Sequence, residues 1–407
     1  MTSFGIIHVA ARAAQTLNQN LLMRKKEIDQ EDWLRIIAAA RLRSEGRTQT
    51  EIAARLGFSQ PEVSRLLEEA MERKILSKGP ALRRRNIPES DYEAAEQAHL
   101  MKDHLAKVLA PLVPQRVHFE VRVAPGDENT FAFAAARRVV DLIVRSRRIG
   151  IMWGRSVLDL VRGIVALSDA FDPAQILDVE CIPLCGDPLF LINDRRVRQS
   201  SSYLAATLEE ALNASKSKGL PCLAGVPAYI SRQRAQDSGT TVDTWRRFLQ
   251  GIPGYEAIFG NTRESTKALI HGVDTIITGV GTIVMVKEAP WRETGDFIME
   301  RLIQDSFSKP EMNRLIYGDI GGILLPREKL SIADMRQVEE LNAGWMGLKL
   351  SHLQTVASRA TPGKVPGVIV VAYGRWKAEM VKECIRRGLV NQLIVDPALA
   401  DALGARD

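Results

Sequence analysis

Two helix-start signals, separated by a glycine, lie within the 23 residues from Thr48 to Ala70. Thr48 with Glu51, and Ser59 with Glu62, fit the capping box, in which a hydroxyl accepts from a free amide of the first turn and the glutamate reaches back. Gly57 suits the left-handed position that ends a helix. The stretch therefore predicts two short helices joined by a tight turn, which is a helix-turn-helix.

The polar face of this unit indicates what it contacts. The second helix of a helix-turn-helix lies in the DNA major groove, with its N-terminal residues facing base edges. The candidate reading residues are Ser59, Gln60, Glu62, Ser64 and Arg65. Thr48 and Gln49, at the start of the preceding helix, are candidates for phosphate contacts. An ordinary helical hairpin with a solvated polar face is the alternative.

The excess positive charge lies in the same part of the chain. Of a net charge of +6 over 407 residues, most comes from residues 1–90, which hold 16 Lys and Arg against 11 Asp and Glu. Such a bias favours binding to a phosphate backbone. We expect a helix-turn-helix DNA-binding domain at 1–85, an exposed arginine-rich linker, and a second domain at 90–407. Residues 1–28 remain ambiguous.

Cysteine usage and hydropathy narrow the class of protein further. The four cysteines show no C-x-x-C pair and no neighbouring histidines at ligand spacing, so neither a zinc site nor a disulfide framework is indicated. The N-terminus lacks the features of a signal peptide, and no apolar run approaches the length of a membrane span. We expect a reduced, cytoplasmic protein without metal or cofactor that does not associate with a membrane.

Beyond residue 90, helical segments alternate with short β-rich runs. We expect helices at 93–112 and 127–145, and strands at 116–123, 149–153, 176–184, 275–279, 321–325, 368–372 and 392–395. Strands separated by helices imply parallel pairing in a sheet covered on both faces, which is the α/β class. In such sheets ligands bind at the carboxyl ends of the strands.

One of these strand ends has the chemistry of an anion site. After the strand at 149–153, the chain turns through Gly154, Arg155 and Ser156 directly into a predicted helix. Free amides at a helix start, a hydroxyl and a guanidinium would together bind an anion such as phosphate. Glycine turns are also common between strand and helix without any ligand, so both interpretations stay open.

The motifs in their order resemble the SorC family of bacterial sugar-responsive transcription regulators. The resemblance covers most of residues 31–403. It rests on the helix-turn-helix and on the segments IGIMWGRSV, DTIITGVGTI, GDIGGILLP and VIVVAYGRWKAEMVKECIRRGLVNQLIVDPALADAL. It implies a Rossmann-like effector domain similar to the sugar-phosphate isomerase and CoA-transferase group. It also implies binding of a sugar or sugar phosphate and assembly as a homodimer or homotetramer.

The resemblance also implies roles for single residues. Gly154, Arg155 and Ser156 would form the phosphate-facing turn. Gly374 and Lys377, which match the family's A-G-G-x-x-K, would complete the anion site, and Asp319 would accept sugar hydroxyls. The alternatives are a helix cap for Asp319 and a surface position for Lys377.

The sequence departs from the family pattern at three positions. Tyr373 replaces a glycine, Trp376 precedes the lysine, and Asp187 replaces a glycine in Leu184-Cys-Gly-Asp. Tyr373 and Trp376 would stack on a sugar face or fill the core.

The function that these observations predict is regulation of carbohydrate metabolism genes. Operator DNA, as an inverted repeat, would be the partner, and a bound sugar or phosphorylated sugar would modulate its binding. The alternative is a sugar-phosphate isomerase-like enzyme with an appended DNA-binding domain, using Asp274 or Asp319 as a base. We assign no catalytic residue, since none of the six histidines lies in a glycine-ended strand loop.

Overall fold

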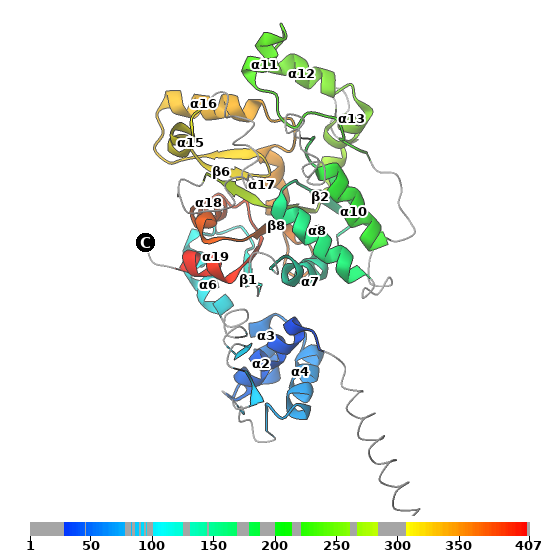
Figure 1. Cartoon of the computed structure of the whole chain (residues 1–407), viewed down its shortest axis with the longest axis vertical. Coiled ribbons are helices and arrows are strands. Elements are labelled where there is room, and N and C mark those ends of the chain that lie inside the picture. The colour runs from blue at the N-terminus through cyan, green and yellow to red at the C-terminus, as the bar shows by residue number, and fades with distance from the viewer. Residues whose placement is uncertain are drawn as a thin grey trace, which may run out of the picture. The chain divides into compact units, whose positions relative to one another are not determined.

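The structure is a computed structural model, and it divides the chain into two compact units, Met1–Glu96 and Gln97–Asp407 (Figure 1). The residues that it describes are 28–44, 46–77, 83, 86–88, 91–92, 95, 101–124, 131–144, 146–168, 179–187, 200–213, 221–260, 267–283 and 307–404. Our interpretation of residues 1–27 and most of the predicted linker lie outside these ranges.

The described part of the smaller unit is built on three helices. They are α2 (Gln30–Ser44), α3 (Gln49–Leu56) and α4 (Gln60–Glu72). Helix α2 packs on the other two, because Leu34 and Ile37 are apolar at helical spacing and both are fully buried. The Trp33 indole Nε1 donates to Asp91 Oδ2 at 2.7 Å, which ties the start of α2 to the segment after the helix-turn-helix.

The larger unit contains a six-stranded parallel sheet in the order β1-β9-β8-β4-β2-β3. Its strands are β1 (Glu120–Val123), β2 (Arg148–Ile151), β3 (Glu180–Pro183), β4 (Thr275–Thr278), β8 (Gly367–Ala372) and β9 (Gln392–Val395). Parallel pairing confirms the predicted α/β class. Most strands are shorter than predicted, and β1 begins at Glu120 rather than at 116.

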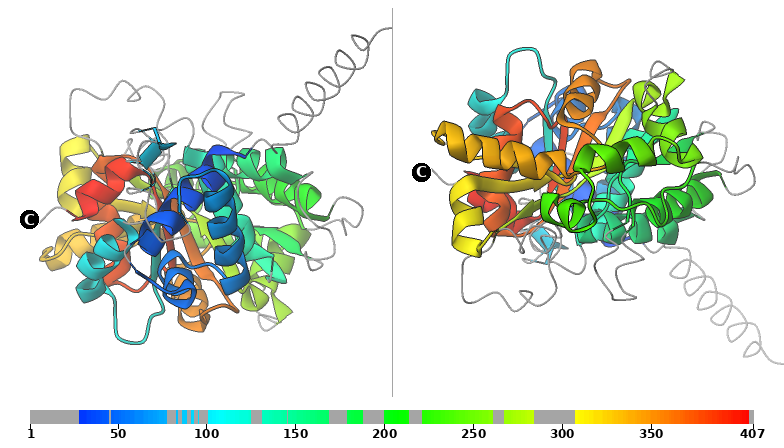
Figure 2. Two further views of the ribbon diagram at one scale, coloured as in Figure 1. Left: turned by 90° about the horizontal axis from the view of Figure 1, so that it is seen from below. Right: turned by 90° about the horizontal axis from the view of Figure 1, so that it is seen from above.

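Helices cover both faces of this sheet because its strands are apolar on both sides. Along β8, Ile369 and Val371 belong to one apolar cluster, whereas Val368 and Val370 belong to the other. The first face carries α7 (Phe131–Ile143), α8 (Arg155–Leu167) and α10 (Ser201–Asn213); the second carries α6 (Met101–Leu109), α17 (Leu350–Arg359), α18 (Ala378–Arg386) and α19 (Pro397–Gly404). Figure 2 shows the teal-green and the red helices on opposite sides of the strands.

A second, antiparallel sheet was not anticipated from the sequence. It consists of β5 (Val280–Thr282), β6 (Ile316–Ile320) and β7 (Ile323–Pro326). The prediction that 321–325 forms a strand of the parallel sheet is therefore wrong. Gly321 and Gly322 have φ values of 57° and 82°, and a two-residue hairpin needs positive φ at both central positions. The glycine pair thus forms the turn between β6 and β7, and β7 runs antiparallel to β6.

The remaining helices surround these sheets. They are η3 (Ala110–Leu112), α11 (Arg232–Asp237), α12 (Val242–Leu249), α13 (Pro253–Phe259), η6 (Leu269–Gly272), α15 (Lys309–Leu315), α16 (Ile332–Ala343) and η8 (Arg375–Lys377). The helix predicted at 93–112 corresponds to α6 followed by η3, and the one predicted at 127–145 corresponds to α7.

Candidate functional site

The start and end of α3 follow the predicted signals. Thr48 Oγ1 accepts from the Glu51 amide at 3.2 Å, and Glu51 Oε2 accepts from the Thr48 amide at 2.8 Å, which completes the capping box. The bonds that the Thr48 amide and the Thr48 hydroxyl donate to Glu51 Oε2 lower the pKa of the Glu51 carboxyl below its ordinary value. Gly57 adopts the left-handed conformation with φ 71° and donates its N–H to the Ala53 carbonyl. The helix-turn-helix is confirmed.

The start of α4 forms only half of its predicted capping box. Ser59 Oγ accepts from the Glu62 amide at 3.3 Å, but the contacts at this helix start include no return bond from the Glu62 carboxylate to Ser59 N–H. Pro61 lies in the first turn, where a missing N–H costs nothing. Glu62 is half-buried.

The predicted reading residues lie on the outer side of the unit. Arg65, Gln60, Ser59 and Thr48 are exposed, and Gln49, Glu62 and Ser64 are half-buried. The apolar positions of the same helices are buried: Ile52, Leu56, Val63, Leu66 and Leu67. Within the described residues, the polar face is thus accessible to a partner, and DNA contact by these seven residues stays a prediction.

A pocket in the larger unit lies at the carboxyl ends of three adjacent strands. Residues that follow β2, β4 and β8 line it, together with the β6–β7 hairpin. The lining is Trp153, Gly154, Arg155, Ser156, Gly279, Val280, Gly281, Asp319, Gly321, Tyr373 and Lys377. The empty space is about 440 Å³, part of it open to solvent.

One wall of the pocket is the N-terminus of α8. Gly154 precedes the helix with φ 124°, a conformation that side chains disfavour, and no side chain caps the helix start. The first amides of this 13-residue helix therefore face the pocket, where the helix dipole favours negative charge. Ser156 is buried beside them.

Two cations approach the same space from different segments. Arg155 Nη1 lies 3.5 Å from the Tyr373 hydroxyl, and Lys377 Nζ lies 5.0 Å from the centroid of the Tyr373 ring. Lys377 is only 4% exposed, so the alternative of a surface lysine is wrong. A positive wall of this kind suits an anionic ligand.

Asp319 faces these cations from β6. Its Oδ2 accepts from the Gly322 amide at 2.7 Å within the hairpin, so it does not cap a helix. Burial raises the pKa of the Asp319 carboxyl to about 6, while the Gly322 amide and the charge of Lys377 act in the opposite direction. The carboxyl therefore changes its charge near neutral pH.

Gly374 is the one predicted effector residue that does not line the pocket. Its φ is 94°, and the Trp376 ring lies 2.3 Å from the position that a Cβ would occupy. Trp376 therefore packs on the backbone at Gly374. The Gly374 amide donates to Asp396 Oδ1 at 3.0 Å, which fixes the loop after β8.

Several pocket residues were missed by the sequence interpretation. Gly279 and Gly281 stand in the motif DTIITGVGTI, directly after β4, and that position was the available signal. Trp153, Val280 and Gly321 line the pocket too; they lie in the segments IGIMWGRSV, DTIITGVGTI and GDIGGILLP, but none of them was given a role. Asp187 does not line it, and its Oδ2 accepts from the Gly225 amide at 2.8 Å.

Of the two carboxylates considered for catalysis, Asp319 lines the pocket and Asp274 lies at the other end of the sheet. Asp274 precedes β4, and its Oδ2 accepts from the Arg147 amide at 3.0 Å. His271 precedes it in η6 and packs against His352. No histidine is among the residues that line the pocket.

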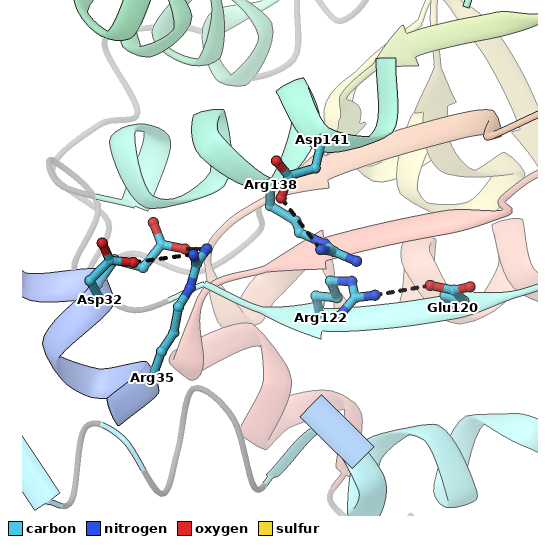
Figure 3. A network of polar contacts seen from close by, with 7 residues as sticks. Asp32, Arg35, Glu120, Arg122, Arg138 and Asp141 are labelled. Atoms are coloured by element: carbon cyan, nitrogen blue, oxygen red, sulfur yellow. Dashed lines mark hydrogen bonds and ion pairs between the residues drawn. The ribbon is translucent and has the colours of Figure 1, made fainter. Parts of the chain in front are cut away.

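A second group of cations, on β1 and α7, forms ion pairs with carboxylates. Arg122 bonds Glu120 at 3.2 Å, and Arg138 bonds Asp141 at 3.5 Å. Figure 3 shows both pairs, together with the Arg35–Asp32 pair of the smaller unit. Burial, followed by the positive charge of Arg138, lowers the pKa of Arg122 to about 10. This cluster lies outside the pocket.

The described residues contain no group of three or more His, Cys, Asp or Glu side chains that could hold a metal ion. In the same ranges, no helix is both long and apolar enough to cross a membrane.

Comparison with known proteins gives structural matches of low identity. No protein-family model matches the chain, and no curated protein matches its sequence. The full-length sorbitol operon regulator SorC from Klebsiella pneumoniae is 17% identical with a TM-score of 0.49, over 91% of this chain and 98% of that one. A probable sor operon regulator from Shigella flexneri is 15% identical with a TM-score of 0.48, over 75% and 98%. A DeoR family transcriptional regulator from Listeria monocytogenes is 16% identical with a TM-score of 0.45, over 74% and 98%.

Proposed function

We propose that the protein is a DNA-binding transcription regulator of carbohydrate metabolism genes whose operator binding responds to a sugar or phosphorylated sugar. The observation that carries this proposal is the presence in one chain of a helix-turn-helix with an exposed polar face and a pocket that joins a helix N-terminus to two cations. The SorC-like motifs imply the same function.

The pocket supports binding better than catalysis. Sugar-phosphate isomerisation needs a group poised to move protons at the substrate. Asp274 lies at the opposite strand ends, and Asp319 is held by the Gly322 amide with no histidine beside it in the pocket lining. We therefore propose a regulator rather than an enzyme, and turnover of any sugar phosphate by the wild type would contradict this proposal.

We expect symmetric assembly because the predicted reading residues of one chain form only a small DNA-contacting surface. One helix-turn-helix contacts only a few base pairs, so two copies on an inverted repeat are needed for useful discrimination. A homodimer or homotetramer in the cytoplasm fits this requirement. Sedimentation of the full chain at micromolar concentration should show at least a dimer, and a strict monomer that binds a half-site as tightly as a full site would exclude it.

Substitution of Arg65 tests whether the predicted reading residues contact DNA bases. The operator is first selected from randomised DNA with the full-length protein. Arg65→Ala should then lose a base contact of about 1–3 kcal/mol and relax preference at one position. Unchanged affinity and selectivity at matched salt would exclude this role. Lys364→Ala, an exposed position of the larger unit, is the control that should leave both unchanged.

Arg155 and Lys377 test the effector site. Each alanine variant should lose about 1.5–3 kcal/mol of affinity for a phosphorylated sugar in calorimetry, because a charge-assisted hydrogen bond is lost. Arg162→Ala, on the same helix but exposed and paired with Asp159, is the matched control. Operator affinity without effector should be retained in all three variants. Wild-type effector binding by both pocket variants would place the site elsewhere.

A further inference from the structure

The larger unit has a second pocket, which is lined by residues of α11 and of the C-terminal half of α16. Tyr229, Phe307 and Leu341 contribute to the lining, together with polar side chains of both helices. This pocket shares no lining residue with the one at the start of α8. A ligand in the second pocket would therefore contact none of the groups of the proposed effector site.

The backbone beside this pocket is held by bonds between segments that are far apart in the chain. Just before α11, the Ile230 N–H donates to the Gly344 carbonyl, directly after α16, at 2.9 Å. The Arg232 guanidinium pairs with the Glu340 carboxylate at 3.0 Å and so joins the two helices. The walls of the pocket are thus positioned by the fold itself, as is usual for small-molecule sites.

Tyr229 is the least exposed polar residue of the lining. Only 3% of it is exposed, and its ring lies against Gly344, where a Cβ would be 2.7 Å from the ring Cε2. In the described part of the chain, its hydroxyl makes no hydrogen bond. Burial raises the pKa of this hydroxyl, so it stays protonated and can donate. Since buried hydroxyls are normally hydrogen-bonded, a ligand in the pocket would supply the partner that the fold does not.

The polar lining carries no net charge. Arg232 and Glu340 neutralise each other, and the other polar lining residues are Tyr229 and three glutamines. The start of α11 offers no further positive end, because Ser231 Oγ caps it by accepting from the Arg234 amide at 3.2 Å. This pocket therefore lacks the features that suit the pocket at α8 to an anion.

The side-chain amides of the lining can both donate and accept hydrogen bonds. Those of Gln236 and Gln337 make no hydrogen bond with the other described residues, so both functions of each amide are available. Hydroxyl groups have the same dual character. Phe307 and the buried Leu341 add apolar surface, which suits the C–H groups between the hydroxyls of a sugar or polyol.

We propose that this second pocket binds an uncharged polyhydroxy compound, a sugar or sugar alcohol without phosphate. The Tyr229 hydroxyl donates to one ligand oxygen, and the amides of Gln236 and Gln337 bond to further hydroxyls. The Glu340 carboxylate, held by Arg232, accepts from the ligand at the rim. The inference goes beyond the proposed function and does not require that the pocket at α8 hold the effector.

Calorimetry of the full-length protein with D-glucose, D-fructose, D-sorbitol and D-mannitol tests the site. At least one of the four should give saturable binding. Tyr229→Phe should weaken that binding about tenfold, because one hydrogen bond is lost. Gln337→Ala should weaken it several-fold. Tyr203→Phe, at an exposed tyrosine on α10, is the matched control and should bind as the wild type does.

Thermal unfolding separates a ligand-binding role of Tyr229 from a structural one. Because its hydroxyl has no partner in the described part of the fold, Tyr229→Phe should unfold at the wild-type temperature or slightly above it in the absence of sugar. A clearly lowered unfolding temperature would mean that the hydroxyl bonds to the protein, and the inference would be wrong.

Three further outcomes would overturn the inference. The first is that none of the four compounds binds. The second is that binding is unchanged in both Tyr229→Phe and Gln337→Ala, or is lost in Arg155→Ala, which would place the sugar in the pocket at α8. The third is a loss of assembly by Gln337→Ala in sedimentation, which would make this surface an interface between copies. Failure of anion binding at α8 would contradict only the proposed effector site.

Discussion

The reading helix and the pocket differ in how their residues are distributed along the chain. All seven candidate DNA-binding residues lie between Thr48 and Arg65, whereas the pocket draws on segments from Trp153 to Lys377. The first arrangement follows from caps and helical spacing, which act over a few residues. The second exists only when β2, β4, β8 and the β6–β7 hairpin are in place. Local perturbations should therefore damage the two regions in different ways.

Loss of core packing in the smaller unit should give the largest effect. Ile52 is fully buried, so Ile52→Ala should cost about 2–5 kcal/mol of stability and abolish operator binding. Anion binding by the larger unit should be retained, which calorimetry and gel shifts on the same preparation can show. Ile332→Ala, at an 85% exposed isoleucine, is the control. If Ile52→Ala lost both operator binding and anion binding, the two regions would not be independent.

A substitution at the β6–β7 hairpin, which lines the pocket, should destabilise the larger unit. At Gly322, φ is 82° and a Cβ would lie 2.3 Å from the Trp345 ring. Gly322→Ala should therefore cost about 1–2 kcal/mol for the conformation and about 1–3 kcal/mol for overpacking. Gly363→Ala, with φ 68° but open space around it, should cost only the first amount. Thermal unfolding compares the two variants, and equal losses would rule out the contact with Trp345.

The charge of Asp319 should make anion binding depend on pH. Since its pKa is raised to about 6, the folded state holds the proton more tightly than the unfolded chain; this contribution to stability is lost as pH rises through about 6. A bound anion favours the neutral carboxyl, so affinity should rise as pH falls, by about tenfold if binding raises the pKa of Asp319 by one further unit. Sulfate, which does not titrate between pH 5 and 8, is the ligand for calorimetry. Asp319→Asn should flatten the profile; an unchanged profile would assign the effect to another group.

The smallest expected effect concerns the two helix starts. Thr48→Ala should cost about 1 kcal/mol, since both halves of its capping box are lost. Ser59→Ala should cost less, because α4 keeps only one of the two bonds. Urea unfolding of the full chain resolves the difference if the smaller unit has its own transition. A larger loss at Ser59 would mean that the reciprocal bond at Thr48 contributes little.

The features that were predicted correctly from the sequence are those determined by interactions between residues close together in the chain. The helix-turn-helix, the parallel sheet and the strand-to-helix turn at Gly154 follow from caps and hydrophobic spacing. The same rules placed Gly321 and Gly322 inside a strand at 321–325, whereas the pair forms the turn of the β6–β7 hairpin. They also could not place Asp274, which precedes β4, whereas the pocket lies at the other end of that strand. The contact between Arg155 and Tyr373 joins residues 218 positions apart, and no local pattern encodes it.

The uncapped start of α8 determines which part of the protein would respond first to a bound ligand. Gly154 offers no side chain to the first amides, so an anion in the pocket would itself serve as the cap of the helix. Binding would then complete a piece of secondary structure. The amide protons of Ser156 and Val157 would exchange with solvent more slowly once the ligand is present. The first response to the ligand would thus be reduced fraying of the first turn of α8, before any larger movement.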